Sequence, residues 1–336
     1  MRKSIKNSPY YIIAEIGMNH NGNLKKALQL IKEAKKTGVN AFKFQMHIAD
    51  EETTKNAPRP PYFKSESRFE YFKRTAFSDK QWLKLKNYAH KLNLNFIVSP
   101  FSIKAAKILK KIGVDAYKIP SGEVTNHPML EYINKTKIPV LMSTGMSNWK
   151  EIDEAVKILN NNLQILFQCS TEYPCQPESV GLNVIEEMKK KYRNLAIGFS
   201  DHTLDDSSSI AALVKGATVF EKHFTLSKKD YGPDAKFSLE PQEMKNYVEG
   251  IRFVSQALKY KVNKNNLIKY KEMKKIFEKS IVAAKQLKKN KILQLTDLAF
   301  KKPGDGIRAD EYKTLIGKKL IKNKYKDEKI TYADIE

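Results

Sequence analysis

Residues 95–123 read NFIVSPFSIKAAKILKKIGVDAYKIPSGE. The runs 95–101 and 116–123 are rich in β-branched and aromatic residues, and between them, over 103–112, apolar residues recur at helical spacing. Two parallel strands need a long crossover between them, and that crossover is usually a helix. The stretch therefore predicts a strand, a helix and a second strand parallel to the first.

The same alternation extends in both directions from this stretch. Further strands are expected at residues 10–17, 41–47, 139–146, 163–174, 196–203 and 218–225. Further helices are expected at residues 24–37, 79–92, 127–134, 148–160, 183–191, 206–215 and 241–260, with a long insertion near 50–78. Eight strand-helix units predict an α/β fold, the closed (β/α)8 TIM barrel. The alternative, an open doubly wound sheet, usually has a glycine-rich first turn, whereas the first turn here reads MNHNGN.

The sequence changes character after residue 260. Residues 261–275, KVNKNNLIKYKEMKK, offer few apolar side chains for a core and are predicted to form a linker or a loose helix. Residues 276–336 hold short strand-like runs separated by turns, which is too little for a second large core. We therefore expect a catalytic barrel at 1–260 and a small β-rich domain at 276–336.

Composition limits the classes of partner. The chain has 336 residues, of which 41% are hydrophobic, enough for a packed core. Its net charge of +24 comes from lysines spread over predicted helix surfaces, and no apolar run approaches the roughly 20 residues of a membrane helix. We therefore expect neither nucleic acid nor a membrane as partner. Two cysteines, Cys169 and Cys175, form no disulfide framework, which favours a cytoplasmic location.

Polar side chains end the predicted strands, where a TIM barrel carries its catalytic groups. Lys43 and Lys118 end two different strands, and a lysine that points into a barrel is costly to bury unless an anion lies near it. Hydroxyl groups end or follow other strands: Ser99, Ser121, Ser143, Thr171 and Ser200. Two lysines with hydroxyl groups suit a bound phosphate. The alternative is that both lysines extend outward into water.

Two histidines end neighbouring strands. His202 and His223 could share one ion, and imidazoles with oxygen ligands suit Mn²⁺, Fe²⁺, Co²⁺ or Zn²⁺. The alternative is that each is a hydrogen-bonded core residue. Glu15 and Glu123 are candidates for acid–base work, or for pairing with a pocket lysine. The remaining four histidines show no such pairing and are interpreted as structural, with His20 in the first loop as a possible exception.

Nine motifs together carry a resemblance that covers nearly the whole chain. They occur in the order AEIGMNHNG, FKFQMHI, SPFS, YKIPSGE, LMSTGM, CSTEYP, GFSDHTLD, EKHFTLSKKDYGPD and KKPGDG. The set resembles the sialic acid synthases, bacterial enzymes that make N-acetylneuraminate and related nine-carbon acids. The resemblance implies a TIM barrel followed by a small SAF, or antifreeze-like, domain. It also implies a domain-swapped homodimer in which residues 301–306 reach the neighbour's site.

The resemblance implies a reaction and residue roles. Phosphoenolpyruvate would condense with an N-acetylated amino sugar, typically N-acetylmannosamine, while water adds and phosphate leaves. Phosphoenolpyruvate binding would fall to Lys43, Ser99, Lys118, Ser121, Ser143, Thr171 and Ser200. Sugar binding would fall to Glu15, Gln45, Tyr173, Asp234 and Lys302. Catalytic roles are implied for Glu123, Glu15, Lys118 and Lys43. His202 and His223 would bind a divalent metal ion, usually Mn²⁺, with Mg²⁺ or Co²⁺ as alternatives.

The chain departs from that pattern at three positions. Lys302 stands before Pro303 where the family usually has arginine, so the charge is kept but the planar fork is lost. Ser99 and Thr171 replace other residues of some members and keep a hydroxyl group. Two rival readings stay open: a legionaminate or pseudaminate synthase that uses a diacetamido-dideoxy hexose, and a non-enzymatic protein that binds anions or nucleic acid.

Overall fold

The computed structural model describes residues 9–59 and 65–336. The chain divides into two compact units, Met1–Tyr260 and Lys261–Glu336. Each unit is described by itself.

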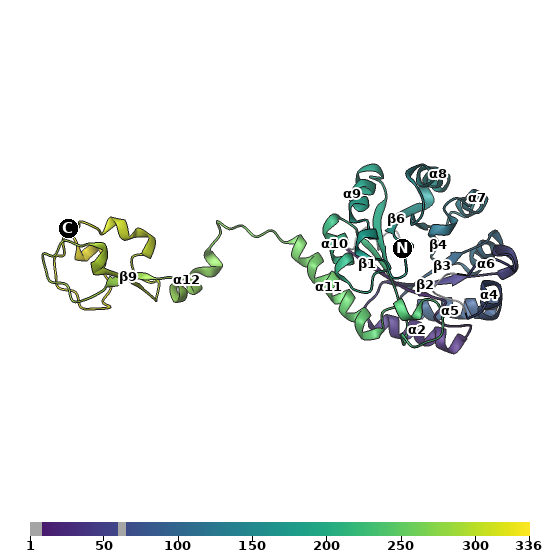
Figure 1. Ribbon diagram of the computed structural model, residues 1–336, viewed down its shortest axis with the longest axis horizontal. Helices are drawn as coiled ribbons and strands as arrows, with labels where there is room; N and C mark the ends of the chain where they lie inside the picture. The colour runs from purple at the N-terminus through teal and green to yellow at the C-terminus, as the bar shows by residue number, and fades with distance from the viewer. Residues whose placement is uncertain (1–8, 60–64) are drawn as a thin grey trace. The chain divides into compact units, whose positions relative to one another are not determined.

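The first unit is built on a closed barrel of eight parallel strands in chain order, which confirms the predicted TIM barrel (Figure 1). The strands are β1 (Tyr11–Gly17), β2 (Ala41–Met46), β3 (Asn95–Pro100), β4 (Ala116–Ile119), β5 (Val140–Ser143), β6 (Leu163–Cys169), β7 (Ala196–Asp201) and β8 (Val219–His223). Several are shorter than expected, because the polar residues that follow them leave the sheet to form loops. After β4, for example, Ser121–Glu123 form a 3-10 turn.

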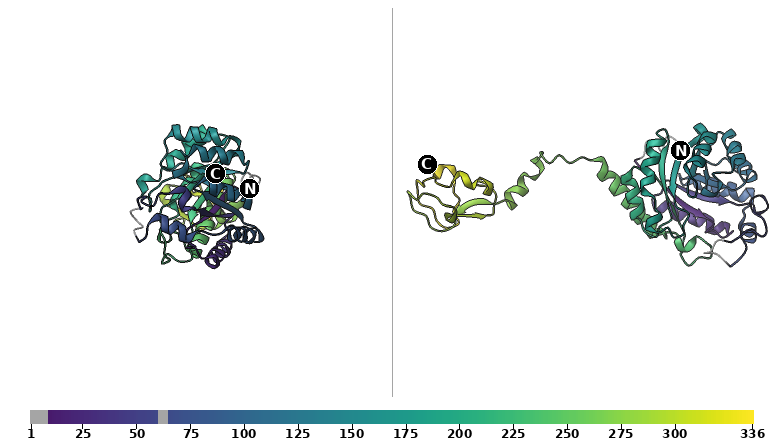
Figure 2. Two further views of the ribbon diagram at one scale, coloured as in Figure 1. Left: turned by 90° about the vertical axis from the view of Figure 1, so that its right-hand side faces the viewer. Right: turned by 45° about the horizontal axis from the view of Figure 1, so that its top comes forward.

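Helices form the outer layer around these strands (Figure 2). They are α2 (Leu24–Lys36), α5 (Asp79–Lys91), α6 (Ile103–Ile112), α7 (His127–Lys135), α8 (Trp149–Leu159), α9 (Leu182–Lys191), α10 (Ser207–Lys215) and α11 (Pro241–Lys259). Helix α6 shows how the sequence sets their ends: the Ser102 side chain accepts a hydrogen bond from the Ala105 backbone, and Gly113 ends the helix in the left-handed conformation. No helix of the described residues has the length and apolar character needed to cross a bilayer.

The insertion after β2 contains two further helices that the sequence analysis did not predict. These are α3 (Ala49–Glu52) and α4 (Arg68–Thr75). The aromatic side chains of Phe69, Tyr71 and Phe72 on α4 are buried in a small cluster of their own beside the first loop. Part of the insertion, residues 60–64, lies outside the described residues.

Inside the barrel, alternate residues of each strand face the axis, and the character of these residues changes along it. Toward the strand starts the interior is apolar and includes Tyr11, Ile13 and Val219. Two residues further along the same strands are charged, because Glu15 follows Ile13 and Glu221 follows Val219 at this spacing. The barrel interior therefore has an apolar layer near the amino ends of the strands and a charged layer near their carboxyl ends.

The second unit contains a small antiparallel sheet, as expected for a small β domain, although most of its residues lie in turns and loops. Its strands are the antiparallel pair β9 (Ser280–Ala283) and β10 (Leu298–Lys301), and its one α-helix among the described residues is α12 (Lys271–Phe277). Its 3-10 turns are η5 (Ile268–Tyr270), η6 (Leu295–Asp297), η7 (Ala309–Thr314) and η8 (Tyr332–Asp334). Its core holds the buried side chains of Ile281, Ala283, Leu287, Leu293, Leu298, Ile307, Leu315, Leu320 and Ile330. Neither η5 nor α12 buries a residue.

Candidate active site at the carboxyl end of the barrel

Four charged side chains form a buried cluster across the carboxyl end of the barrel. Lys43 Nζ lies 2.8 Å from Glu15 Oε2 and 3.6 Å from Glu221 Oε1. Lys118 Nζ lies 3.0 and 2.9 Å from the two carboxylate oxygens of Glu221. Because Lys118 on β4 reaches Glu221 on the opposite strand β8, both lysines point into the barrel. The alternative in which the lysines extend outward into water is thereby excluded.

Burial and mutual attraction determine the protonation of this cluster. Burial alone raises the pKa of Glu221, but the ammonium groups of Lys118 and Lys43 outweigh it and bring the pKa to about 2. Burial raises the pKa of Glu15, and attraction to Lys43 offsets this only in part. Burial likewise lowers the pKa of Lys118, with Lys43 nearby adding to the effect. Glu221 therefore stays ionised, and Glu15 is the carboxyl group of the cluster that is most easily protonated.

Hydroxyl groups surround the two lysines. Ser200 donates a hydrogen bond of 3.1 Å to Glu221, and Ser99 Oγ lies 3.5 Å from Lys43 Nζ. Ser143 is buried, and its Oγ has no hydrogen-bond partner among the described residues. A buried hydroxyl without a partner is costly, so its position beside the charged layer suits a ligand oxygen.

A cavity of about 340 Å³ opens above the charged cluster. Its lining includes the predicted residues Gln45, Ser121, Thr171, Tyr173, His202, His223 and Asp234. Gly145 lets two of them approach each other, because a side chain there would overlap Ser121 Oγ and press on Thr171. The structure thus brings two of the predicted hydroxyl residues, Ser121 and Thr171, and both imidazoles to one cavity, whereas Ser99, Ser143 and Ser200 are not part of its lining.

The two imidazoles lie together on the cavity wall. The ring centroids of His202 and His223 are 5.4 Å apart. His202 Nε2 lies 3.0 Å from the Tyr173 hydroxyl, and its Nδ1 lies 2.6 Å from the Ser170 carbonyl oxygen. His223 Nδ1 is buried and has no hydrogen-bond partner among the described residues, and burial together with the positive charges of His202 and Lys43 lowers the pKa of His223.

Three polar groups converge at Gly17, whose φ is +51°. A Cβ there would lie 3.0 Å from Asp234 Oδ2, 3.4 Å from Glu15 Oε1 and 3.5 Å from Gln45 Nε2. Gln45 Nε2 also donates a hydrogen bond of 2.7 Å to Glu15. Burial, with the charge of Glu15, raises the pKa of Asp234 to about 6. This is a second carboxyl group that can carry a proton near neutral pH.

Two predicted site residues lie elsewhere. Glu123 accepts a hydrogen bond of 2.7 Å from Asn126 and does not line the cavity, so its role in proton transfer stays a prediction. Lys302 belongs to the second unit, where its ammonium group lies 5.0 Å from the centre of the Phe277 ring. Arg308, six residues after Lys302, forms an ion pair of 2.9 Å with Asp310.

Three residues of the site were missed in the sequence. Glu221 joins both lysines, and it could have been found, because it lies two residues before His223 and therefore faces the same way along β8. His47 and Arg68 line the cavity as well. Arg68 could not have been found, because it comes from the insertion to which no helix had been assigned.

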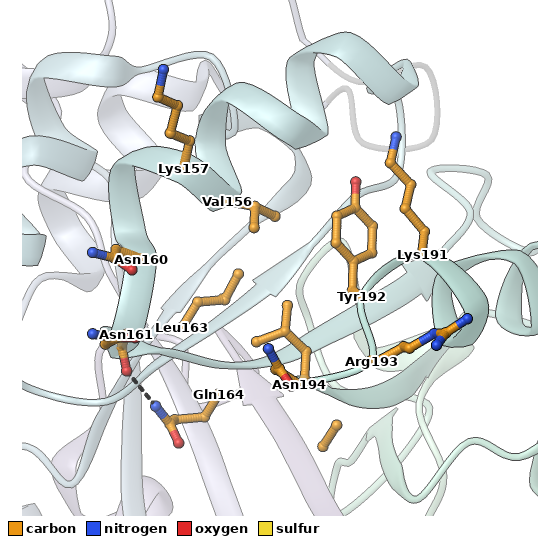
Figure 3. Close-up of a pocket in the computed structure, with 12 residues that line it drawn as sticks. Val156, Lys157, Asn160, Asn161, Leu163, Gln164, Lys191, Tyr192, Arg193 and Asn194 are labelled. Atoms are coloured by element: carbon orange, nitrogen blue, oxygen red, sulfur yellow. Dashed lines mark hydrogen bonds between the residues drawn. The ribbon is translucent and has the colours of Figure 1, made fainter.

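A larger cavity, of about 760 Å³, lies at the opposite end of the barrel, where β6 and β7 begin (Figure 3). Its lining combines aliphatic and amide side chains with Tyr192 and three basic residues, Lys157, Lys191 and Arg193. Figure 3 shows the ammonium groups of Lys157 and Lys191 extending away from Asn161 and Gln164. Gln164 there donates its hydrogen bond, 2.8 Å long, to the backbone oxygen of Asn161. Volume alone therefore does not locate the site.

Known proteins resemble this chain over nearly its whole length. The NeuB family profile matches residues 30–263, and the SAF domain profile matches residues 278–336. An uncharacterized protein of Methanocaldococcus jannaschii is 40% identical over 334 residues, covering 98% of this chain and 95% of its own. The N,N′-diacetyllegionaminic acid synthase of Campylobacter jejuni is 38% identical over 329 residues, covering 95% and 98%.

A solved structure gives the same result. The N-acetylneuraminic acid synthetase from Leptospira borgpetersenii superposes with a TM-score of 0.68 at 31% identity, covering 80% of this chain and 91% of its own. The charged cluster and the paired imidazoles thus occur in a chain whose relatives are named synthases of sialic acids. The chain belongs to the NeuB family, the sialic acid synthase family, and carries a SAF domain at its C-terminal end.

Proposed function

We propose that this enzyme condenses phosphoenolpyruvate with an N-acylated amino sugar and water, giving a nine-carbon 2-keto acid and phosphate. The observation that carries the proposal is the pair of buried lysines, Lys43 and Lys118, held by Glu221 within reach of serine hydroxyls and beside two imidazoles. A small ligand with both a phosphate and a carboxylate matches two inward-facing ammonium groups.

The charge balance of the cluster explains how an anion could enter. Two lysines and two glutamates are nearly neutral together, so a bound anion needs a proton or a displaced partner. Burial already raises the pKa of Glu15, and an anion nearby raises it further. Protonation of Glu15 would release Lys43 to the ligand while Glu221 keeps Lys118 in place.

Proton transfer falls to the carboxyl groups that face the acceptor. As the carbon–carbon bond forms, the aldehyde oxygen of the open-chain sugar becomes a hydroxyl group and needs a proton. Protonated Glu15 and Asp234 both lie at the Gly17 turn, where the acceptor would bind, and either can donate it. Gln45 and Tyr173 would orient the sugar from the cavity wall.

The two imidazoles fit a divalent metal ion, for which we propose Mn²⁺, with Mg²⁺ or Co²⁺ as alternatives. His223 offers a buried nitrogen without a hydrogen-bond partner and is held neutral, as a ligand must be. The described residues contain no group of three or more His, Cys, Asp and Glu side chains, so the remaining ligands would be oxygens of water and substrate. Such an ion would polarise the aldehyde.

The cavity favours a diacetamido-dideoxy hexose as the acceptor. Met18, Phe72, Phe101 and Met146 give part of its wall an apolar surface, which suits a methyl group better than a sugar hydroxyl. The 38% identity to a legionaminic acid synthase points the same way. N-Acetylmannosamine, the acceptor expected from the sequence, is the competing substrate.

Release of inorganic phosphate from phosphoenolpyruvate tests the proposal. The wild-type enzyme is incubated with Mn²⁺ and each of three sugars in turn: the diacetamido-dideoxy hexose, N-acetylmannosamine and glucose as a control. We expect phosphate release and a nine-carbon product by mass spectrometry with one of the first two sugars. If none of the sugars supports phosphate release, the proposed function is contradicted. If the enzyme prefers N-acetylmannosamine, only the proposed choice of acceptor is contradicted.

We also propose that the enzyme works as a homodimer in the cytoplasm. Exposed apolar side chains crowd the segment that joins the two units, among them Val262, Ile268, Ile276 and Phe277, and a partner subunit would cover them. Both cysteines are free and buried, which suits a reducing compartment.

Subunit mixing tests whether the second unit serves the partner's barrel. Lys118→Met inactivates the barrel, and Lys302→Ala weakens the unit that would contact the sugar. If the units are exchanged, mixed dimers of the two variants contain an intact site, and activity returns on mixing. If each unit serves its own barrel, mixing the variants restores nothing.

A further inference from the structure

We propose that His47 is a positioning residue for acceptor binding, which it accomplishes by fixing the orientation of the Gln45 amide. The inference rests on the proposed function and names a residue that the sequence analysis set aside as structural. His47 directly follows β2, is 6% exposed, and lines the same cavity as the two imidazoles.

The ring of His47 is held on four sides. It stacks on Phe72 at a centroid distance of 3.8 Å and an interplanar angle of 3°, and on Phe101 at 4.1 Å and 26°. Its Nδ1 lies 2.6 Å from Glu52 Oε1, and its Nε2 lies 3.1 Å from Gln45 Oε1. The other oxygen of Glu52 accepts a bond of 3.2 Å from the Ile48 backbone. An imidazole fixed in this way has a single orientation.

The partners at each end determine which group donates and which accepts in the series of hydrogen bonds from Glu15 through Gln45 to His47. Before an anion binds, Glu15 is paired with the Lys43 ammonium group and accepts as a carboxylate, so the Gln45 nitrogen faces it, at 2.7 Å. The Gln45 oxygen then faces His47, whose Nε2 donates to it while Nδ1 donates to the Glu52 carboxylate. An amide turned by 180° has the same shape, but it would place oxygen against Glu15 and nitrogen against the His47 donor. The wrong orientation is therefore penalised twice, once at Glu15 and once at His47.

The orientation of the Gln45 amide affects binding of the acceptor sugar. Gln45 Nε2 is one of the three polar atoms that converge at Gly17, with Glu15 and Asp234. It occupies one oxygen of Glu15 and leaves the other to Lys43. A Gln45 amide free to rotate would present the wrong group to a sugar hydroxyl and loosen Glu15. Phenylalanine would fill the space between Phe72 and Phe101 equally well, so packing alone does not explain an imidazole here.

Two substitutions separate the hydrogen bond from the packing. His47→Gln can place an amide nitrogen close to the position of Nε2, whereas His47→Asn reaches only the position of Nδ1. Both lose the aromatic stack to the same extent. We expect His47→Asn to raise the acceptor KM about tenfold, His47→Gln to raise it less than threefold, and both to leave the phosphoenolpyruvate KM within twofold of wild type.

Each outcome decides the matter. Equal acceptor KM values for the two variants, or a parallel rise in the phosphoenolpyruvate KM, would overturn the positioning role. If His47→Asn does not fold, His47→Phe, which keeps the stack, replaces it and should show the same tenfold rise; wild-type KM would contradict the inference. Absence of phosphate release by the wild-type enzyme with every sugar would instead overturn the proposed function, and the inference with it.

Discussion

The two ends of the barrel differ in what they bury. At the amino end the interior of the barrel is apolar, and a larger cavity has a mixed lining of amide, aliphatic and basic side chains. The ammonium groups of Lys157 and Lys191 there extend away from Asn161 and Gln164. At the carboxyl end a cavity of less than half the volume lies above two lysines, two glutamates and a pair of imidazoles, all buried. Buried charge is costly to keep in a fold, so it marks a functional site better than cavity volume does.

The largest difference in activity is expected between two single substitutions, one lysine replaced at the carboxyl end and another at the amino end. Lys118→Met should reduce phosphate release by ~10³-fold or more, because it removes an anion partner from the site. It also leaves Glu221 with Lys43 alone, which costs about 3–5 kcal/mol of folding free energy. Lys157→Met at the amino end should leave both phosphate release and the melting temperature near wild type.

The double variant Lys118→Met/Glu221→Gln keeps the cluster neutral and separates these two effects. It should recover much of the melting temperature without recovering phosphate release. Recovery of both would show that Lys118 serves the fold and not the ligand.

Metal binding gives the second test. His223→Ala should weaken Mn²⁺ binding by about tenfold or more, since it removes one of the two proposed protein ligands. Titration calorimetry with Mn²⁺ measures this directly. His127→Ala, on the half-exposed first turn of α7, is the matched control and should bind the ion as wild type does. Unchanged affinity for His223→Ala would remove it from the ligand set.

Asp234 gives a test through the pH dependence of folding stability. Burial raises its folded-state pKa to about 6 from an ordinary value of 3.8, so the folded protein prefers the protonated form. The associated stability is fully present below about pH 4 and is lost as the pH rises through 6. The loss is on the order of 3 kcal/mol by pH 8.

Asp234→Asn should therefore remove this pH-dependent loss. Its melting temperature should exceed that of wild type at pH 8 and match it at pH 4, while its acceptor KM rises. Thermal unfolding across this range measures the difference, and parallel profiles for the two proteins would contradict the burial of a titrating carboxyl group.

Gly145 gives the smallest effect. A methyl group there overlaps Ser121 Oγ, so Gly145→Ala should displace this hydroxyl and raise the phosphoenolpyruvate KM severalfold. Gly250→Ala on α11 is the control, because its nearest neighbour would lie at an ordinary 3.8 Å. Steady-state kinetics compares the two, and equal KM values would show that Ser121 does not contact phosphoenolpyruvate.

Much of this arrangement could be predicted from the sequence. Alternating strand and helix patterns gave the barrel, and the barrel places the strand ends at one face, which brought Lys43, Lys118, His202 and His223 together. Glu221 is predictable in the same way, because it lies two residues before His223 on β8 and therefore faces the same side of the strand.

Other features could not be predicted because they depend on contacts between distant segments. Helix α4 is stabilised by burial against the first loop, and nothing in its sequence shows that Phe72 will stack on His47. Glu123 looked equivalent to Glu15 at a strand end, yet the chain turns after β4 and directs it to Asn126.

Binding of phosphoenolpyruvate measured by titration calorimetry tests the central claim most directly. The wild-type enzyme should bind one molecule per chain in the absence of sugar, with affinity that falls as salt is added. The folded Lys118→Met/Glu221→Gln variant should show no binding. Equal binding by both proteins would contradict the claim that the buried lysines of the carboxyl end hold the anion.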